Sequence, residues 1–193
     1  SEVLLGRKVC SLSGVLTTDL TLVAGNYYKL DGKVAVGIDM GSDGTKTGGA
    51  SATLTIEPGV TVFGESGNDY LVVTRGSKIN AVGTSSAPIV MTGRQDILGE
   101  ADIVNTRGLW GGLVLLGKSP INKCSFSTPG TSTTAGTRVN PCEKDVEGSV
   151  GDTMGGEIPT DSSGTLKYVR VQYAGYEVFP GNELNGITFG GVG

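Results

Sequence analysis

Short runs of β-branched and other apolar residues recur along the sequence, and each run stops at a bend made by glycine, proline, asparagine or aspartate. In three of these runs Ile56, Val73 and Ile89 are 17 and 16 residues apart. The corners that follow them, such as Pro58-Gly59 and Arg75-Gly76, differ from the Asn-Gly or Asp-Gly turns that antiparallel hairpins favour. Strands joined by bends at a nearly constant spacing are typical of a solenoid. The pattern therefore predicts an all-β parallel β-helix, with a β-sandwich as the second choice.

No segment keeps a 3.6-residue apolar period over the length of a helix, so we expect almost no helix. The strand-like segments are short, as in other all-β folds. The clearest are LTLVAG from Leu20, KVAVGI from Lys33, ATLTIEPGVTVFG from Ala52, YLVVTRG from Tyr70, SKINAVG from Ser77, PIVMTG from Pro88, LVLLG from Leu113, TLKYVRVQYAG from Thr165 and GITFGG from Gly186.

The composition agrees with a chain that turns often around one core. Glycine accounts for 33 of the 193 residues, more than twice the usual share of about 7%. The hydrophobic share of 37% is sufficient for one core of this size. We expect a single β-helix domain over residues 1–193, and the pattern also fits the N-terminal part of a longer solenoid.

The formal net charge is −4, the pI is near 4.8, and the basic residues form no cluster. Nucleic-acid binding needs such a cluster, so we exclude that class of partner. No apolar run reaches the ~18 residues of a membrane span. Histidine is absent, which removes Ser-His-Asp and Cys-His catalysis and the commonest zinc ligand. Any chemistry must therefore use carboxylates, Lys, Arg, Tyr or Cys.

Cys124 and Cys142 bracket a Ser/Thr/Gly/Pro-rich segment with little apolar content to hold it in place. A disulfide between them would close a loop over residues 123–143 and stabilise it. Because disulfides persist in oxidising compartments, this pairing predicts an extracellular or bacterial cell-surface protein. A pair of free thiols is the alternative. Cys10 is left over, either as a small buried residue or as half of an intermolecular bridge.

Two acidic clusters are candidate Ca²⁺ sites. Asp39 and Asp43 lie four positions apart in a glycine-rich loop, and Glu147 and Asp152 belong to a second cluster beside the cysteine loop. Ca²⁺ prefers carboxylate and carbonyl oxygens. The first pair departs from the EF-hand pattern, however, and solvated acidic loops are the alternative for both clusters. The fold requires no cofactor, and Ca²⁺ is an optional ligand.

The single tryptophan lies in GLWGGLVLLGKSPIN, residues 108–122. In a β-helix, Gly111 and Gly112 can turn a corner or allow a neighbouring coil to approach closely. Trp110 then either covers the core at this corner or presents its ring to a sugar.

Two further aromatic residues, Tyr173 and Tyr176, are candidates for a glycan-binding surface, and packing of the adjoining loop is the alternative. The Thr53-Leu-Thr55 triplet raises the idea of an ice-binding face, which needs the same pair of threonines on successive coils. The runs at Val72 and Ile89 do not supply that pair. Outward threonines on ordinary strands are the simpler interpretation.

Several motifs occur in a particular order: LTIEPGVTVFG, YLVVTRGSKINAVGTSSAPIVMTG, RGLWGGLVLLGKSPIN, VEGSVGD, SGTLKYVRVQYAGYE and ELNGITFGGVG. In this order they resemble a family of secreted bacterial right-handed β-helix proteins, many of them described only as lipoproteins or hypothetical surface proteins. The resemblance covers roughly residues 15–193. It implies a right-handed parallel β-helix at the cell surface, and it implies no particular reaction.

Polysaccharide-active enzymes also use this fold, because its long flat faces bind extended polymers. Pectin hydrolases of this fold carry Asn-Thr-Asp and Gly-His-Gly segments, whereas Arg107 follows Asn105-Thr106 here and histidine is absent. Pectate lyases use calcium-bound aspartates with an arginine as base. Arg138 and Arg170 have no matching set of aspartates around them in the sequence, so we lean away from an enzyme.

A solenoid exposes unpaired backbone groups and part of its core at an uncapped end. The sequence stops within a strand pattern, so we expect either that the protein continues beyond Gly193 or that a second copy stacks there, giving a filament or surface layer. We therefore predict an extracellular structural or adhesive protein that associates end to end or binds a surface polysaccharide. A polysaccharide-binding or polysaccharide-cleaving enzyme is the alternative, and a cleft joining Asp39 and Asp43 with Arg107 or Arg138 would favour it.

Overall fold

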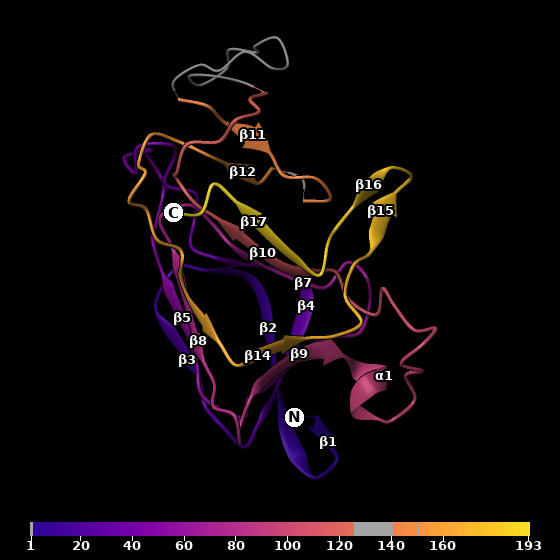
Figure 1. Ribbon diagram of the computed structural model, residues 1–193. Coiled ribbons are helices and arrows are strands. Elements are labelled where there is room, and N and C mark those ends of the chain that lie inside the picture. Colours follow the sequence, from indigo (N-terminus) through magenta and orange to yellow (C-terminus); the bar gives the residue numbers. More distant parts are fainter. Residues whose placement is uncertain (1, 126–140, 150) are drawn as a thin grey trace.

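Strands joined by bends dominate the structure, a computed structural model that describes residues 2–125, 141–149 and 151–193. The chain winds in successive coils, and most strands pair in parallel with the strand at the same place in the next coil (Figure 1). A single helical turn, α1 (Arg94–Ile97), is the helix in the described residues. The predicted parallel β-helix with almost no helix is confirmed.

The stacked strands form three faces around a common core. The first face contains, in order, the first part of β2 (Arg7–Leu16), the first part of β4 (Tyr27–Val36), β6 (Thr61–Gly64), β9 (Ile89–Gly93) and β14 (Val169–Val171). The second face contains the last parts of β2 and β4, then β7 (Tyr70–Val73), β10 (Gly112–Leu116) and β17 (Ile187–Gly190). The third face contains β3 (Leu20–Leu22), β5 (Thr53–Ile56), β8 (Lys78–Val82) and β13 (Gly164–Lys167).

Antiparallel pairs occur only in excursions from these faces, within the part of the chain that is described. They are β1 (Val3–Leu4) with β2, β11 (Lys144–Asp145) with β12 (Thr153–Met154), β15 (Glu177–Phe179) with β16 (Asn182–Glu183), and a bridge between Ile38 and Ala50. The β-sandwich, our second expectation, is wrong, because strands that neighbour each other within the three faces run parallel, whereas a sandwich is built from antiparallel sheets.

The core consists of side chains that repeat at the same place in successive coils. On the third face Leu22, Ile56, Ala81 and Leu166 occupy equivalent positions, and all four belong to the central apolar cluster or pack against it. Because side chains alternate across a strand, every second residue of each short strand faces this cluster. The recurring Ile and Val residues of the sequence are these inward positions.

The predicted strand TLKYVRVQYAG from Thr165 is in fact two strands, β13 and β14, on different faces. The bend between them is Tyr168, whose φ is 49°, and its carbonyl accepts a hydrogen bond from the Ile89 amide at 3.0 Å. A tyrosine in the left-handed region is uncommon, so residue type did not reveal this corner.

Two glycines allow coils to approach closely at a corner. Gly112 has a φ of 133°, and a Cβ there would lie 2.2 Å from the carbonyl oxygen of Asn185 in the next coil. A Cβ on Gly111 would lie 2.8 Å from side-chain atoms of Leu184 and Tyr70. The predicted role of these glycines in close approach is therefore confirmed.

Inserted segments cover the outer sides of two faces. β1 and α1 lie against the first face, where Leu4 and Phe63 form a small apolar cluster. The segments between β10 and β13 and between β14 and β17 contribute Val146 and Leu184, which pack on Val114 of the second face. No described segment covers the outer side of the third face, which forms one edge of the molecule in Figure 1.

Candidate functional site

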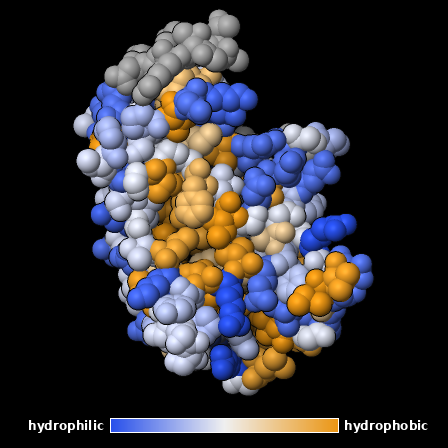
Figure 2. Space-filling view, in the orientation of Figure 1, coloured by the Kyte–Doolittle hydropathy of each residue, from blue (hydrophilic) through white to orange (hydrophobic). Residues whose placement is uncertain are grey.

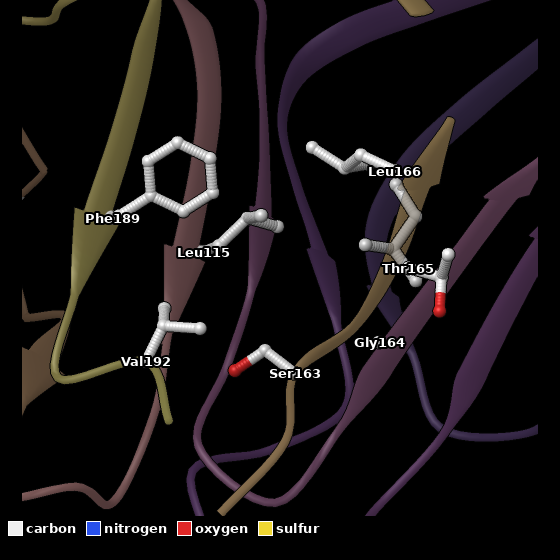
Figure 3. Close-up of a pocket in the computed structure, with 8 residues that line it drawn as sticks. Leu115, Ser163, Gly164, Thr165, Leu166, Phe189 and Val192 are labelled. Carbon is white, nitrogen blue, oxygen red and sulfur yellow. The ribbon is translucent and has the colours of Figure 1, made fainter. Parts of the chain in front are cut away.

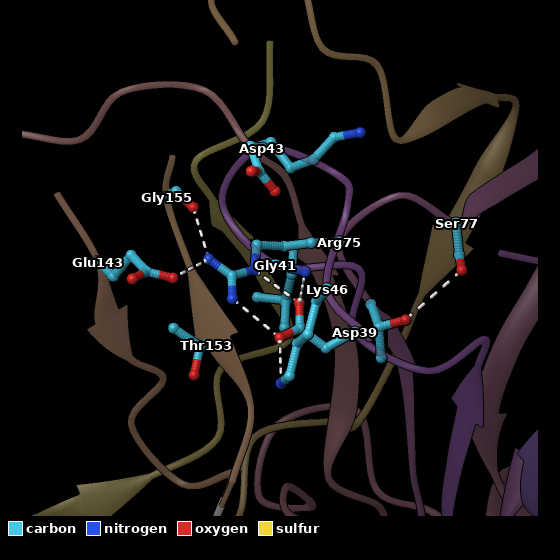
Figure 4. A network of polar contacts seen from close by, with 12 residues as sticks. Asp39, Gly41, Asp43, Lys46, Arg75, Ser77, Glu143, Thr153 and Gly155 are labelled. Carbon is cyan, nitrogen blue, oxygen red and sulfur yellow. Dashed lines mark hydrogen bonds and ion pairs between the residues drawn. The ribbon is translucent and has the colours of Figure 1, made fainter. Parts of the chain in front are cut away.

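A buried arginine joins two excursions of the chain at one corner of the β-helix (Figure 4). Arg75 follows β7, and its side chain is only 3% exposed. Its Nε and Nη2 donate to the two carboxylate oxygens of Asp39 at 2.7 and 2.8 Å. Its Nη1 donates to Glu143 Oε1 at 2.6 Å and to the carbonyl oxygen of Gly155 at 2.8 Å. Because Asp39 belongs to the loop after β4 and Glu143 to the segment after β10, Arg75 ties both to the core.

The charges in this network stabilise one another. Burial acts to raise the pKa of the Asp39 carboxyl, but the hydrogen bonds and charges of Arg75 and Lys46 outweigh it and hold that pKa below its usual value. Burial likewise acts to lower the pKa of Arg75, and its bonds to Asp39 and Glu143 raise it instead. These shifts favour the charged forms of both Asp39 and Arg75.

This network contains an arginine with two carboxylates, as a lyase site does, but a substrate cannot reach the arginine. Four N–H groups of the Arg75 guanidinium are already donated within the protein, and the side chain is sealed from solvent. A general base must reach the proton that it removes. Arg75 therefore acts as a structural clamp.

The cleft that would have favoured an enzyme does not form in the described residues. Asp39 meets Arg75 and not Arg107, which is exposed. Arg138 lies outside the described residues. Arg75 was missed as a site residue because its partners are 36 and 68 positions away in the sequence; the one local signal was its place in an Arg-Gly corner.

Asp39 and Asp43, the first pair predicted to bind Ca²⁺, each have other partners. Asp39 faces Arg75 and Lys46, and Asp43 accepts hydrogen bonds from the amide and hydroxyl of Thr45 at 2.9 and 2.8 Å. Hydrogen bonds from Thr45 lower the pKa of Asp43. The described residues contain no group of three or more His, Cys, Asp or Glu side chains that could hold a metal ion.

In the second pair predicted to bind Ca²⁺, Asp152 lies in the interior and Glu147 lies at the surface. Asp152 is buried, contacts the hydroxyl of Ser149, and forms an ion pair with Lys33 Nζ at 2.6 Å. Glu147 is exposed to solvent. Asp152 therefore helps to hold the segment after β10 against β4, which is a structural role.

The predicted disulfide between Cys124 and Cys142 is present, and both residues are buried. It precedes Glu143 directly, so it holds the partner of Arg75 in place. Residues 126–140 of the predicted loop lie outside the described residues. Cys10 is a free, partly buried thiol that packs against the core in the first coil.

The aromatic candidates do not form one glycan-binding surface. Trp110 is 0% exposed, and its indole N–H donates to the carbonyl oxygen of Gln172 at 2.8 Å. The interpretation that Trp110 covers the core is therefore correct, and the alternative that its ring stacks on a sugar is wrong. Tyr173 and Tyr176 are half-buried, and the Tyr176 ring lies so close to Gly67 that a Cβ there would be 2.0 Å from it.

The C-terminal coil carries an open apolar groove, which the sequence analysis did not locate. It has a volume of about 260 Å³ and is lined mainly by Ile79, Leu115, Leu166, Phe189 and Val192. In Figure 3 the labelled side chains of Leu115 in β10, Leu166 in β13, Phe189 in β17 and Val192 just after β17 border one hollow. The same region is the apolar hollow at the centre of the face in Figure 2. The groove is an uncovered part of the core.

A stack of parallel coils with inserted loops defines the class of parallel β-helix proteins. Residues 14–193 match the family described as the pectate-lyase like beta helix domain, and the chain belongs to this family. No curated protein and no solved structure matches the chain.

Within the described residues, no helix is long and apolar enough to cross a membrane.

Proposed function

We propose that this β-helix is an extracellular structural domain that associates end to end through its C-terminal coil. The observation that carries the proposal is the change in exposure along one inward column of the second face. Val36, Val73 and Leu115 are 1%, 0% and 3% exposed, whereas Phe189 at the same place in the last coil is 61% exposed. Each earlier member is covered by the coil that follows it.

A neighbouring column supports the same conclusion. This column runs through Val34, Leu71 and Leu113, which are completely or almost completely buried. Ile187, which pairs with Leu113 and continues the column, is exposed. Burying a large apolar side chain contributes about 1.5–3 kcal/mol. Covering Phe189, Ile187 and the adjoining groove would therefore stabilise a contact by several kcal/mol before the cost of association is subtracted.

The edge strands of this coil add hydrogen-bonding capacity. β13, β14 and β17 lie at the ends of their faces, so their outer backbone groups can pair with strands of a second copy. The N-terminal end of the β-helix offers fewer unpaired backbone groups and fewer exposed inward side chains. There β1 already pairs with Arg7 and Lys8 of β2, and the inward side chains of Leu12 and Leu22 are buried. The C-terminal coil is the end that gains most from a partner.

The extracellular location rests on the disulfide. Cys124 and Cys142 are bonded to each other, and such bonds persist in oxidising compartments. A structural role at the cell surface is consistent with a core clamp, Arg75, that is closed to ligands.

Light scattering of the protein over a range of concentrations, combined with its intact mass, tests the proposal. We expect assemblies that Phe189→Asp converts to monomers and that the matched variant Asn185→Asp leaves intact, because Asn185 is exposed on the same coil and receives the same charge. A protein that stays monomeric at every concentration would overturn the proposal. An intact mass showing further coils beyond Gly193 in place of a second copy would also overturn it.

A further inference from the structure

The sequence contains a single Asn-Gly pair, Asn185-Gly186, which lies on the C-terminal coil directly before β17. Asparagine is one of the thermolabile residues of proteins. In an Asn-Gly pair the backbone nitrogen of the glycine can attack the side-chain carbonyl carbon of the asparagine, because no Cβ on the glycine hinders the approach. The pair is therefore a candidate site of covalent change.

The structure leaves both reacting groups of this pair free. Asn185 is exposed to solvent and lies outside the strands. Within the described residues, neither its side chain nor the Gly186 N–H forms a hydrogen bond. The space at Gly186 is also open, since a Cβ there would lie 4.0 Å from the nearest atoms, on Ala174 and Val171. Neither a hydrogen bond nor crowding at the glycine opposes the attack.

Two Asp-Gly pairs can undergo the same attack in principle, and the structure opposes both. Asp31-Gly32 lies within β4, and the N–H of its glycine donates to Asp69 Oδ1 at 2.8 Å. In Asp43-Gly44 the carboxylate accepts hydrogen bonds from the amide and hydroxyl of Thr45. An ionised carboxylate is in addition a poorer electrophile than an amide. The free groups of the Asn-Gly pair therefore distinguish it from these two pairs.

We propose that Asn185 converts spontaneously to isoaspartate in the folded protein and that this conversion displaces β17. The Gly186 nitrogen forms a bond to Cγ of Asn185, the bond from Cγ to the side-chain nitrogen breaks, and that nitrogen leaves as ammonia with the Gly186 proton. Water then opens the resulting succinimide ring. Opening at the Cγ carbonyl gives aspartate, whereas opening at the main-chain carbonyl gives isoaspartate, whose main chain runs through Cγ.

Isoaspartate lengthens the main chain between two points that are held in place. On one side Leu184 is buried, and its N–H donates to the carbonyl oxygen of Tyr176 at 2.8 Å. On the other side the carbonyl oxygen of Gly186 accepts a hydrogen bond from the Leu113 N–H at 3.1 Å, where the pairing of β10 with β17 begins. The additional methylene inserts a C–C bond of about 1.5 Å between these points, so the strand that follows must shift.

The strand that shifts carries the apolar side chains of the association surface. Ile187 and Phe189 belong to β17, and both are exposed. A shift of β17 changes the surface that a second copy would cover, so isoaspartate at position 185 would weaken end-to-end association as the protein ages. This effect on association rests on the proposed function, whereas the conversion and the shift of β17 do not.

Peptide mapping by mass spectrometry of the folded protein, incubated at mildly alkaline pH, tests the conversion. We expect isoaspartate to accumulate at Asn185, while Asn80, which precedes Ala81 within β8, stays unchanged. Gly186→Ala should slow the conversion about tenfold, which corresponds to about 1.4 kcal/mol in its barrier. The added methyl group hinders the attack and fits the open space at Gly186, whose φ is outside the left-handed region. Conversion no faster at Asn185 than at Asn80, or equally fast in Gly186→Ala, would overturn the proposal.

Hydrogen exchange tests the shift of β17. The isoaspartate form, separated by ion exchange, is compared with Asn185→Asp, which gains the same charge on an unaltered main chain. We expect the β17 amides to lose protection in the isoaspartate form alone, and equal protection in the two forms would overturn the proposed shift.

Light scattering of the same two samples tests the effect on association. Asn185→Asp should assemble like the unchanged protein, and the isoaspartate form should not; assembly of the isoaspartate form would overturn this effect. If the fresh protein is monomeric, the proposed function fails, whereas peptide mapping and hydrogen exchange still decide whether Asn185 converts and whether β17 shifts.

Discussion

Replacing Arg75 with methionine should destabilise the fold far more than replacing an exposed arginine. The change keeps most of the side-chain volume but leaves the carboxylates of Asp39 and Glu143 without their shared partner. Removing one member of a buried ion pair typically costs about 3–5 kcal/mol. Because Asp39 keeps its contact with Lys46 Nζ at 3.1 Å, we expect the lower end of this range, about 3 kcal/mol.

Thermal unfolding followed by circular dichroism provides the assay. For a chain of this length a loss of about 3 kcal/mol lowers Tm by about 6–12 °C. Arg94→Met is the matched control, since Arg94 forms ion pairs with Glu2 and Glu65 but is 31% exposed. A surface pair of this kind contributes at most about 1 kcal/mol.

A rescue experiment distinguishes unpaired charge from lost packing. Adding Asp39→Asn and Glu143→Gln to Arg75→Met replaces both carboxylates with neutral groups of similar shape, and should recover part of the lost stability. If Arg75→Met is no less stable than Arg94→Met, or if the triple variant is no more stable than Arg75→Met, the clamp is not electrostatic and our interpretation of this network is refuted.

Three further predictions concern the disulfide, the fluorescence of the tryptophan and the loss of stability at low pH. Reduction of the disulfide, or Cys142→Ser, should lower the free energy of unfolding by about 3 kcal/mol, as expected for a bridge with a sequence separation of 18. Calorimetry with and without reductant measures this loss, and equal Tm values would contradict the prediction. Trp110 should emit at short wavelength and resist acrylamide quenching because it is completely buried, and strong quenching of the folded protein would contradict that position. Folding lowers the pKa of the Asp39 carboxyl. The ionised carboxylate therefore stabilises the fold fully at a pH above the unfolded carboxyl pKa of about 3.9. This stabilisation is lost as the pH falls through the lower pKa that Asp39 has in the folded protein. The Tm advantage of the unchanged protein over Asp39→Asn should therefore shrink in acid, and a constant difference down to pH 2 would contradict this assignment.

Local sequence was sufficient to predict the coils. Strand positions, bends and the repeat of Ile56, Val73 and Ile89 depend on neighbouring residues, because alternation of apolar side chains and the conformations of glycine and proline act over a few positions. The corner at Tyr168 was missed for the same reason, since its residue type is not one that usually turns a chain. The disulfide could be predicted because its two cysteines enclose a segment with few other means of stabilisation.

Polar partners could not be predicted from local sequence. Asp39 and Asp43 look like a cation site when read in order, yet Asp39 pairs with Arg75 and Asp43 with Thr45. Thr165 joins Asn80 only because the chain returns to the third face after the long segment that follows β10. In each case the contact depends on how coils stack, which local patterns do not specify.

The sequence by itself therefore determined that this chain forms short strands joined by bends, and that the strands stack as a parallel β-helix. The tertiary structure alone decided which charges are buried together, why Trp110 is closed to ligands, and where the core is left open at Phe189. The physical reason is that strand formation depends on side chains close in sequence, whereas burial and hydrogen bonding of polar groups depend on residues brought together from different coils.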